Sequence, residues 1–207
     1  MVKILHIGAG HCEEYSYYVE SDVEQVIYFE AAPHLANQAK EKITACNEEK
    51  GRNDKIFHCL LWCESGITKT FRMFNNDTFA STLDINPKEW IWQNIKNLGW
   101  DVKLETTRLD DILEKEGINP EEYDCMAVDV QGAEYDVFMG GEKCLDSIKC
   151  LRFEASTKEF YGGQKTYLEL RKYLERKGFI VEDITSHHTD VHAWRPGYED
   201  YKKHFVY

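Results

Sequence analysis

The pattern that most constrains the fold lies at the start of the chain. A short, mostly apolar run at residues 2–7 ends abruptly in the glycine turn Gly8-Ala9-Gly10, which is typical of a buried parallel strand. A helical stretch at residues 13–20 follows, and a second apolar run at residues 26–29 is closed by Glu30. Strand, glycine turn, helix, strand and acid form the layout of a nucleotide-binding βαβ unit.

The glycine turn also narrows the class of ligand. Glycine lets the backbone approach a ligand closely, and an acid ~20 residues further on can accept hydrogen bonds from both hydroxyls of a ribose. The dinucleotide fingerprint requires a third glycine, but none follows Gly10 until Gly51. The turn therefore favours a ligand with adenine and ribose but no phosphate, namely S-adenosylmethionine. The alternative is that the turn only packs a helix on a sheet.

Strand and helix patterns alternate along almost the whole chain. Apolar runs predict further buried strands at residues 55–62, 123–129, 148–154 and 179–184. Helical spacing predicts helices at residues 33–50, 87–98, 109–116, from 132 onward and at 166–177. Alternating patterns predict two added strands at residues 66–74 and 102–108, and segments at 193–194 and 204–206 are expected to complete the sheet. The prediction is an α/β fold: a doubly wound, mostly parallel sheet with helices on both faces and a small added β-hairpin.

Length and charge set further limits. The 207 residues suit a single domain spanning residues 1–207. No apolar run is long enough to span a membrane, and no export signal is evident. The seven cysteines form no CxxC pair, so they are interpreted as reduced, buried side chains of a cytoplasmic protein. A net charge of −12 argues against nonspecific binding of nucleic acid, because contacts with phosphate need a basic surface.

Ligands of such sheets bind outside the carboxyl ends of the strands. Residues expected at those ends are therefore predicted to converge although they lie far apart in sequence. They are Gly8, Ala9, Gly10, Glu30, Leu61, Trp62, Asp129 and Glu154.

Several motifs, in a consistent order, resemble those of the FkbM-type S-adenosylmethionine-dependent methyltransferases. The run from Asp129 to Glu134 is similar to the family's Asp-Val-Gln/Glu-Gly-Ala-Glu motif. Other similar elements, which together cover most of residues 4–156, are Phe29 to Pro33, Ala80 to Leu83, Thr107 to Asp111, Phe138 to Gly141 and Leu151 to Ser156.

The resemblance implies a Rossmann-like fold with a seven-stranded core, S-adenosylmethionine as methyl donor, and transfer to oxygen, most often a hydroxyl of a sugar or polyketide-like metabolite. The chain departs from the family at His6, where an acid is usual, and at Cys12, where a glycine is usual. The segment from Thr157 onward matches poorly, and acceptor specificity is expected to reside there.

Methyl transfer to a hydroxyl needs alignment of donor and acceptor and a group that takes up the proton. Asp129 and Glu154 are the catalytic candidates, because both follow neighbouring strands beside the expected methyl position. The structural alternatives are that Asp129 caps the next helix and that Glu154 pairs with Arg152 or a lysine. Glu134, in the first turn of that helix, could simply favour the positive helix end.

The donor site is predicted to include Ser81, which would contact the donor's carboxylate, and Trp62, which would stack on adenine. A loop serine is more often solvated, and an aromatic residue at a strand end more often belongs to the core. The full set predicted to bind the donor is Gly8, Ala9, Gly10, Glu30, Ala31, Leu61, Trp62, Ser81 and Asp129.

His187, His188 and His192 lie near Asp190 and raise the question of a metal site. Adjacent histidines on a strand point to opposite faces, so no metal is predicted. One of these histidines contacting the acceptor, or acting as the base, is a minority hypothesis.

The leading hypothesis is an O-methyltransferase that acts on a sugar hydroxyl, with a carbohydrate or small-molecule acceptor and no nucleic-acid or membrane partner. The alternatives are a methyltransferase for another metabolite, acting on oxygen or nitrogen, and an inactive binding subunit with the same fold. An NAD-dependent oxidoreductase is disfavoured by the missing glycine. Its Tyr-x-x-x-Lys spacing does occur, at Tyr161/Lys165, Tyr173/Lys177 and Tyr198/Lys202. The sequence names neither the acceptor nor an oligomeric state.

Overall fold

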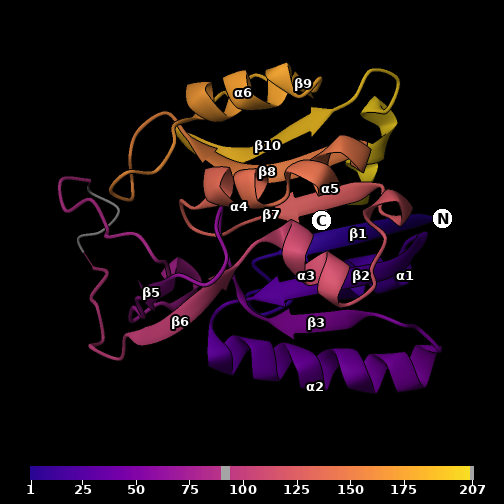
Figure 1. Ribbon diagram of the computed structural model, residues 1–207, viewed down its shortest axis with the longest axis horizontal. Helices are drawn as coiled ribbons and strands as arrows, with labels where there is room; N and C mark the ends of the chain where they lie inside the picture. Colours follow the sequence, from indigo (N-terminus) through magenta and orange to yellow (C-terminus); the bar gives the residue numbers. More distant parts are fainter. Residues whose placement is uncertain (90–93, 206–207) are drawn as a thin grey trace.

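The computed structural model describes residues 1–89 and 94–205, and a seven-stranded sheet forms the centre of this part of the chain (Figure 1). Its strands, in spatial order, are β3 (Lys55–His58), β2 (Val23–Glu30), β1 (Val2–Ile7), β7 (Cys125–Val128), β8 (Cys150–Ser156), β10 (His188–Trp194) and β9 (Ile180–Val181). The first five strands in this order are parallel, whereas β10 is antiparallel to both β8 and β9. The predicted doubly wound, mostly parallel sheet of Rossmann-like type is therefore confirmed.

Helices cover both faces of the sheet, as predicted. Side chains alternate along β1, so that Leu5 and Ile7 pack toward one face and Ile4 toward the other. The first face is covered by α3 (Leu109–Lys115), α4 (Glu134–Gly140), α5 (Glu142–Ser147) and α6 (Tyr167–Arg176). The second is covered by α1 (Tyr15–Glu20), α2 (Pro33–Lys50) and the 3₁₀ helix η4 (Glu199–Phe205). None of the described helices is both long enough and apolar enough to cross a membrane.

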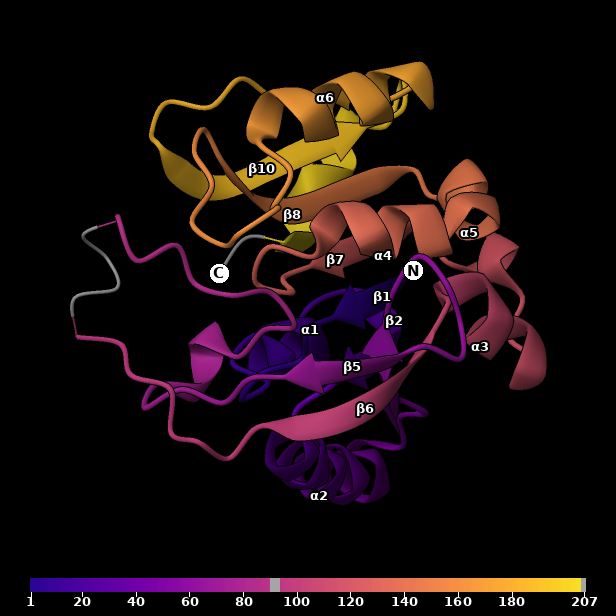
Figure 2. The same ribbon diagram turned by 60° about the vertical axis from the view of Figure 1, so that its left-hand side comes forward.

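A small second sheet lies beside the first, at the end where the parallel strands finish (Figure 2). It contains β4 (Leu60–Leu61), β5 (Thr68–Phe71) and β6 (Val102–Thr107). β5 and β6 are antiparallel, which confirms the predicted hairpin, and β4 adds to β6 in parallel. The single strand predicted at residues 55–62 is thus two strands, because the chain leaves the main sheet at Cys59 and its next residues pair with β6.

Two predictions about secondary structure need correction. The helix predicted at 87–98 falls partly on residues 90–93, which lie outside the described residues, and its described flanks are turns and loops. Local side chains compete there with helical hydrogen bonds: Asn86 Oδ1 accepts from the N–H of Lys88, and Asn75 Oδ1 from that of Lys96.

The strand predicted at 204–206 is also wrong for its described part. His204 and Phe205 belong to η4, and Phe205 is buried against the second face of the sheet. Phe205 is apolar because it packs against the sheet, and it is not part of a strand. Residue 206 lies outside the described residues.

The turn after β1 is tied to both neighbouring strands. The N–H groups of Gly8 and Ala9 donate to the carbonyl of Phe29 at 2.9 and 3.1 Å, and the N–H of Asp129 donates to the carbonyl of Ile7 at 2.9 Å. Gly8 has φ +85°, and a Cβ at this position would lie 1.7 Å from the carbonyl oxygen of Asp129. Only glycine fits this conformation and this contact.

Gly8 and Gly10 therefore differ in how much a substitution by alanine would destabilise the fold. Gly8→Ala must displace the end of β7, so we expect it to lower the free energy of unfolding by about 3 kcal/mol or more. Gly10 has φ +49° with open space around it, so Gly10→Ala should cost only the left-handed strain, about 1–2 kcal/mol. Urea unfolding of the two variants measures both costs. Equal losses would contradict the contact between the turn and β7.

Candidate active site

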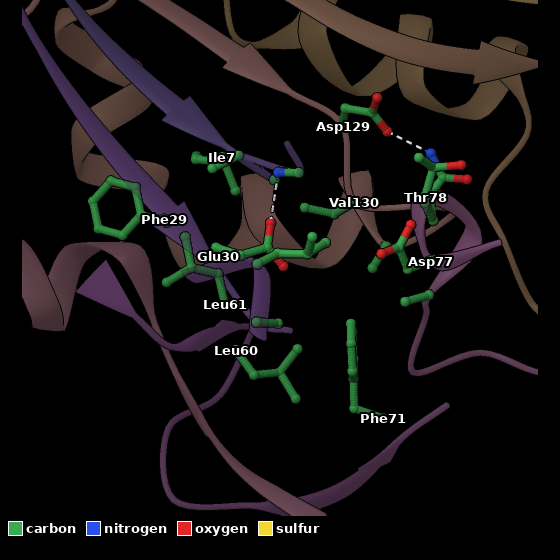
Figure 3. Close-up of a pocket in the computed structure, with 18 of the residues that line it drawn as sticks. Ile7, Phe29, Glu30, Leu60, Leu61, Phe71, Asp77, Thr78, Asp129 and Val130 are labelled. Atoms are coloured by element: carbon green, nitrogen blue, oxygen red, sulfur yellow. Dashed lines mark hydrogen bonds between the residues drawn. The ribbon is translucent and has the colours of Figure 1, made fainter. Parts of the chain in front are cut away.

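A cavity of about 310 Å³ lies beyond the carboxyl ends of β1, β2, β7 and β8 (Figure 3). This volume is at the lower end of the range for small-molecule sites. The strand ends contribute side chains from one side, and the segment 77–82 contributes them from another. The lining residues that matter for the chemistry are Gly8, Ala9, Gly10, Glu13, Glu14, Glu30, Ala31, Leu61, Phe71, Thr82, Asp129, Gln131 and Glu154.

Glu30 is fixed by backbone N–H groups at the middle of the cavity. Its Oε2 accepts from the N–H of Gly10 at 2.8 Å, and its Oε1 from the N–H of Ala32 at 2.7 Å. Its burial raises the pKa of Glu30, and these backbone N–H groups act in the opposite direction. Each carboxylate oxygen has further acceptor capacity, so the side chain can still accept hydrogen bonds from a ligand diol.

One end of the cavity is apolar. Leu35, Leu60, Leu61 and Phe71 line it, and all four are largely buried. In Figure 3, Phe71 lies beside Leu60, across the cavity from Glu30. Phe71 comes from β5 and is not among the residues predicted for the site. The alternating pattern predicts a strand there, but it does not indicate where that strand packs. This end provides a flat, dry surface suited to a heteroaromatic ring.

The other end of the cavity is acidic. Asp129 and Glu154 both line it, and the side chain of Gln131 joins them: Nε2 donates to Asp129 Oδ1 at 2.6 Å and lies 3.4 Å from Glu154 Oε2. Among the described lining residues there is no lysine or arginine, whereas Glu13 and Glu14 add further carboxylates. The cavity thus disfavours anions at this end.

These carboxylates perturb one another. Partial removal from water in the cleft raises the pKa of Asp129 well above its usual value, and repulsion from Glu154 and Glu134 adds to this effect. The side chain of Asp129 nevertheless reaches the open cavity. A carboxylate with a raised pKa is a better proton acceptor near neutral pH.

Glu134 does not line the cavity but supports the loop that does. It is 1% exposed, and its Oε1 accepts from the N–H groups of Val130 and Gly132 at 3.3 and 3.1 Å. Burial, and then repulsion from Glu154, raises the pKa of Glu134 to about 7. Its role is therefore to hold the segment after β7 in place.

Among the residues that the structure describes, neither structural alternative for the two acids is observed. The helix α4 begins after Ala133 without a side-chain cap, so Asp129 does not cap it. Glu154 pairs with His188 (Oε1 to Nε2, 2.9 Å), while Arg152 pairs with Asp190. Both acids remain directed at the cavity.

The predicted histidine cluster is dispersed. His188 bridges Glu154 and Ser156, with Nδ1 2.6 Å from Ser156 Oγ, and the hydrogen bond with Glu154 raises the pKa of His188. His187 and His192 are instead hydrogen-bonded to Thr157 and Glu182. In the described part of the chain, no group of three or more histidine, cysteine, aspartate or glutamate side chains is arranged to hold a metal ion.

The segment 77–82 is anchored beside the glycine turn. Both carboxylate oxygens of Asp77 are occupied, by His11 at 3.1 Å and His34 at 3.0 Å. Thr82 also lines the cavity, and its Oγ1 is buried without a hydrogen-bond partner among the described residues. An unpaired hydroxyl in this place is a ready contact for a polar ligand.

Most residues predicted to bind the donor do line the cavity, but Trp62 and Ser81 do not. Successive residues of a strand point to opposite sides, so Leu61 faces the cavity and Trp62 faces away, where Lys69 lies 3.7 Å from its ring centre. Ser81 is fully buried, and its Oγ donates to the carbonyl of Gln131 at 2.8 Å. Neither side chain is therefore placed at the cavity wall, and the contacts of Trp62 with adenine and of Ser81 with the donor stay predictions.

Comparison with known proteins agrees with this geometry. A family model described as the methyltransferase FkbM domain matches residues 6–181. The 2-O-methyltransferase NoeI of Sinorhizobium fredii (strain NBRC 101917 / NGR234) is 31% identical over 162 residues, which make up 73% of this chain and 60% of NoeI. The chain thus spans less than two thirds of that relative's length.

Two solved structures have a similar fold. The crystal structure of methyltransferase FkbM from Methylobacillus flagellatus KT matches 93% of this chain with a TM-score of 0.58 and 13% identity, and the match covers 43% of that chain. The methyltransferase domain of bacterial CtHen1-C matches 93% of this chain and 89% of its own, with a TM-score of 0.50 and 13% identity. At such identities, the likeness concerns the fold alone.

The raised pKa of Glu134 predicts how stability varies with pH. Between its ordinary value of 4.5 and about 7, the folded protein holds a proton that the unfolded chain releases. The free energy of unfolding therefore falls as pH rises through this window. Glu134→Gln keeps the acceptor oxygen and removes the charge, so it should recover up to about 3 kcal/mol at pH 8 relative to its effect at pH 4.

Urea unfolding at the two pH values measures this recovery. Glu41→Gln, at an exposed position of α2, is the matched control and should show no such recovery. A Glu134→Gln variant with the parent's pH dependence would mean that Glu134 is not buried as a proton-binding group.

Proposed function

This chain belongs to the FkbM family of methyltransferases, and we propose that it transfers a methyl group from S-adenosylmethionine to a hydroxyl of a sugar residue within a glycan. The observation that carries the proposal is the meeting of Glu30 and the Asp129–Glu154 pair in one cavity. The first suits a ribose diol, and the second suits a hydroxyl that must lose its proton.

The cavity has the chemical features that S-adenosylmethionine requires. Leu35, Leu60 and Phe71 would cover the adenine, and Glu30 would accept hydrogen bonds from the ribose hydroxyls. The glycine turn leaves room for the backbone to approach the ligand, since Gly10 has open space where a Cβ would stand. The acidic end favours the positive charges of the sulfonium and ammonium groups.

S-adenosylmethionine supplies a methyl group that is already activated by the positive sulfur. The chain must therefore orient the acceptor and take up one proton. Asp129 or Glu154 would accept the hydroxyl hydrogen bond and receive the proton as the oxygen bonds to the methyl carbon. The sulfur–carbon bond breaks in the same step and leaves S-adenosylhomocysteine. The raised pKa of Asp129 makes it the first candidate. Glu154 is the second, with its Oε1 held by His188 and its Oε2 3.4 Å from the Gln131 amide.

Charge supports a sugar hydroxyl as the acceptor. Carboxylates accept hydrogen bonds from neighbouring hydroxyls, so an acidic wall can hold a polyol in one orientation. An acceptor that carries phosphate would be repelled by the lining acids and by the net charge of −12. The name of NoeI, a 2-O-methyltransferase, agrees with transfer to oxygen.

Donor binding is the first test. S-adenosylhomocysteine at ~100 times its dissociation constant should stabilise the fold by about 2.7 kcal/mol and raise the melting temperature by roughly 5–10 °C, whereas NAD should not. Calorimetry should show at least a tenfold loss of affinity in Glu30→Ala, because charge-assisted hydrogen bonds to the ribose are lost.

Glu24→Ala, at an exposed position of the same strand, is the control and should bind S-adenosylhomocysteine normally. Glu30→Ala will also lose some stability, since Glu30 holds two backbone N–H groups. Affinity is therefore measured at a temperature where both variants are folded. A parent protein that gives no heat with S-adenosylhomocysteine would sink the proposal.

The proton acceptor is the second test. Asp129→Asn keeps the shape of the side chain and should lower turnover of a sugar acceptor ~10²–10⁴-fold if Asp129 takes the proton. Glu154→Gln should do so only if Glu154 is the base. Methylation of a glycan panel, followed by mass spectrometry, measures both rates. Full activity in both variants would exclude the pair and leave His188, which contacts Glu154, as the next candidate.

A further inference from the structure

Gln131 occupies a conformation that its surroundings impose. Its φ is +53°, in the left-handed region that non-glycine residues rarely adopt, and Gly132 follows with φ +97°. The carbonyl of Gln131 accepts the hydrogen bond from the buried Ser81, 50 positions earlier in the chain. A rare backbone conformation that is held by a tertiary hydrogen bond indicates that the direction of the side chain matters.

Both ends of the Gln131 side-chain amide are hydrogen-bonded. Its Oε1 accepts from the hydroxyl of Tyr161 at 2.8 Å, while Nε2 faces Asp129 Oδ1 at 2.6 Å and Glu154 Oε2 at 3.4 Å. An amide nitrogen has two hydrogens, and each can be given to one carboxylate. With its oxygen toward the Tyr161 hydroxyl and its nitrogen toward the acids, the amide can donate to both carboxylates at once.

Without this amide, the two acids would face each other with the buried Glu134 behind them. Repulsion between neighbouring carboxylates favours protonation of one of them, and a protonated carboxyl cannot take a proton from a hydroxyl. Donation from Gln131 opposes that protonation at Asp129. The amide thus favours the ionised form of Asp129, which is the form that can accept the proton in the proposed reaction.

We propose that Gln131 is a positioning residue whose amide holds the Asp129 and Glu154 carboxylates together at the cavity wall and keeps Asp129 ready to accept a proton. The inference rests on the proposed function, because it assigns Gln131 a part in readying the proton acceptor. It goes further, because a neutral side chain would then help to set the pH below which activity is lost.

Other titratable or charged groups also face this pair, and their contributions remain when Gln131 is replaced. They come from the residues just before α1, from α4, β8, the segment after β8 and β10, and they are Glu13, Glu14, Glu134, Arg152, Tyr161, His188 and Asp190. Because they are common to parent and variant, a comparison of the two isolates the amide.

The test is titration of the two carboxyl groups by ¹³C NMR in protein labelled at aspartate and glutamate, with signals assigned from Asp129→Asn and Glu154→Gln. Gln131→Met has a similar length and no amide. We expect it to raise the titration midpoint of Asp129 by about one to two pH units, given the strength of a hydrogen bond to a charged group. Gln38→Met, the same change at an exposed position of α2, should leave the midpoint unchanged.

Tyr161→Phe provides a second variant should Gln131→Met fold poorly. It keeps the amide but frees its Oε1, so the midpoint should rise in the same direction by less. With a sugar acceptor, the acid limb of kcat/KM should move upward together with the midpoint. An unchanged midpoint in the variants, or an acid limb that stays where it is in the parent, overturns the inference.

Failure of the proposed function would be distinguishable from failure of this inference. S-adenosylhomocysteine affinity, measured on the parent protein, reports on the donor site without any change to Gln131. Loss of donor binding by the parent would count against the methyl-transfer proposal. The carboxyl midpoints would still decide whether the amide controls the two acids.

Discussion

The contact between Gly8 and the carbonyl of Asp129 is the constraint on which the site depends. It brings the turn after β1 against the end of β7, while the N–H of Gly8 donates to the end of β2. The ends of these central strands are thereby locked to one another, and the residues that leave them must share one small space. Glu30 then uses the N–H of Gly10 to hold the remainder of the turn. Backbone hydrogen bonds, rather than side-chain contacts, thus set the floor of the cavity.

Concentrating carboxylates in a cavity is costly, and the chain offsets much of this cost with neutral donors, whereas Glu154 also pairs with His188. Backbone N–H groups satisfy Glu30 and Glu134, and the amide of Gln131 satisfies Asp129. A lysine or arginine in the lining would neutralise the acids, but it would also repel a sulfonium donor and compete for the proton acceptor. Neutral donors stabilise the carboxylates and leave the cavity's negative potential available to a ligand.

The fold and the position of the site were readable from the sequence because both follow from strand order. Apolar runs and glycine turns locate the parallel strands, and ligands bind at their carboxyl ends whatever the side chains are. The sequence could not place Phe71, whose strand folds back from another sheet, nor the direction of Trp62, which depends on the strand's alternation after the break at Cys59. In the sequence, Gln131 stands out only as part of the motif from Asp129 to Glu134. Its role depends on a left-handed backbone conformation that a glutamine gives no sign of adopting.

The two departures from the family pattern bear on whether the chain is an active enzyme. His6 lies on the face of β1 away from the cavity, hydrogen-bonded to Tyr18 and buried under α1. Cys12 is fully buried with φ +52°, so it takes up the backbone conformation that a glycine would adopt, and Lys42 donates to its carbonyl. Neither side chain lines the cavity. The substitutions that first suggested an inactive binding subunit therefore change the packing behind the turn and leave the residues at the strand ends in place.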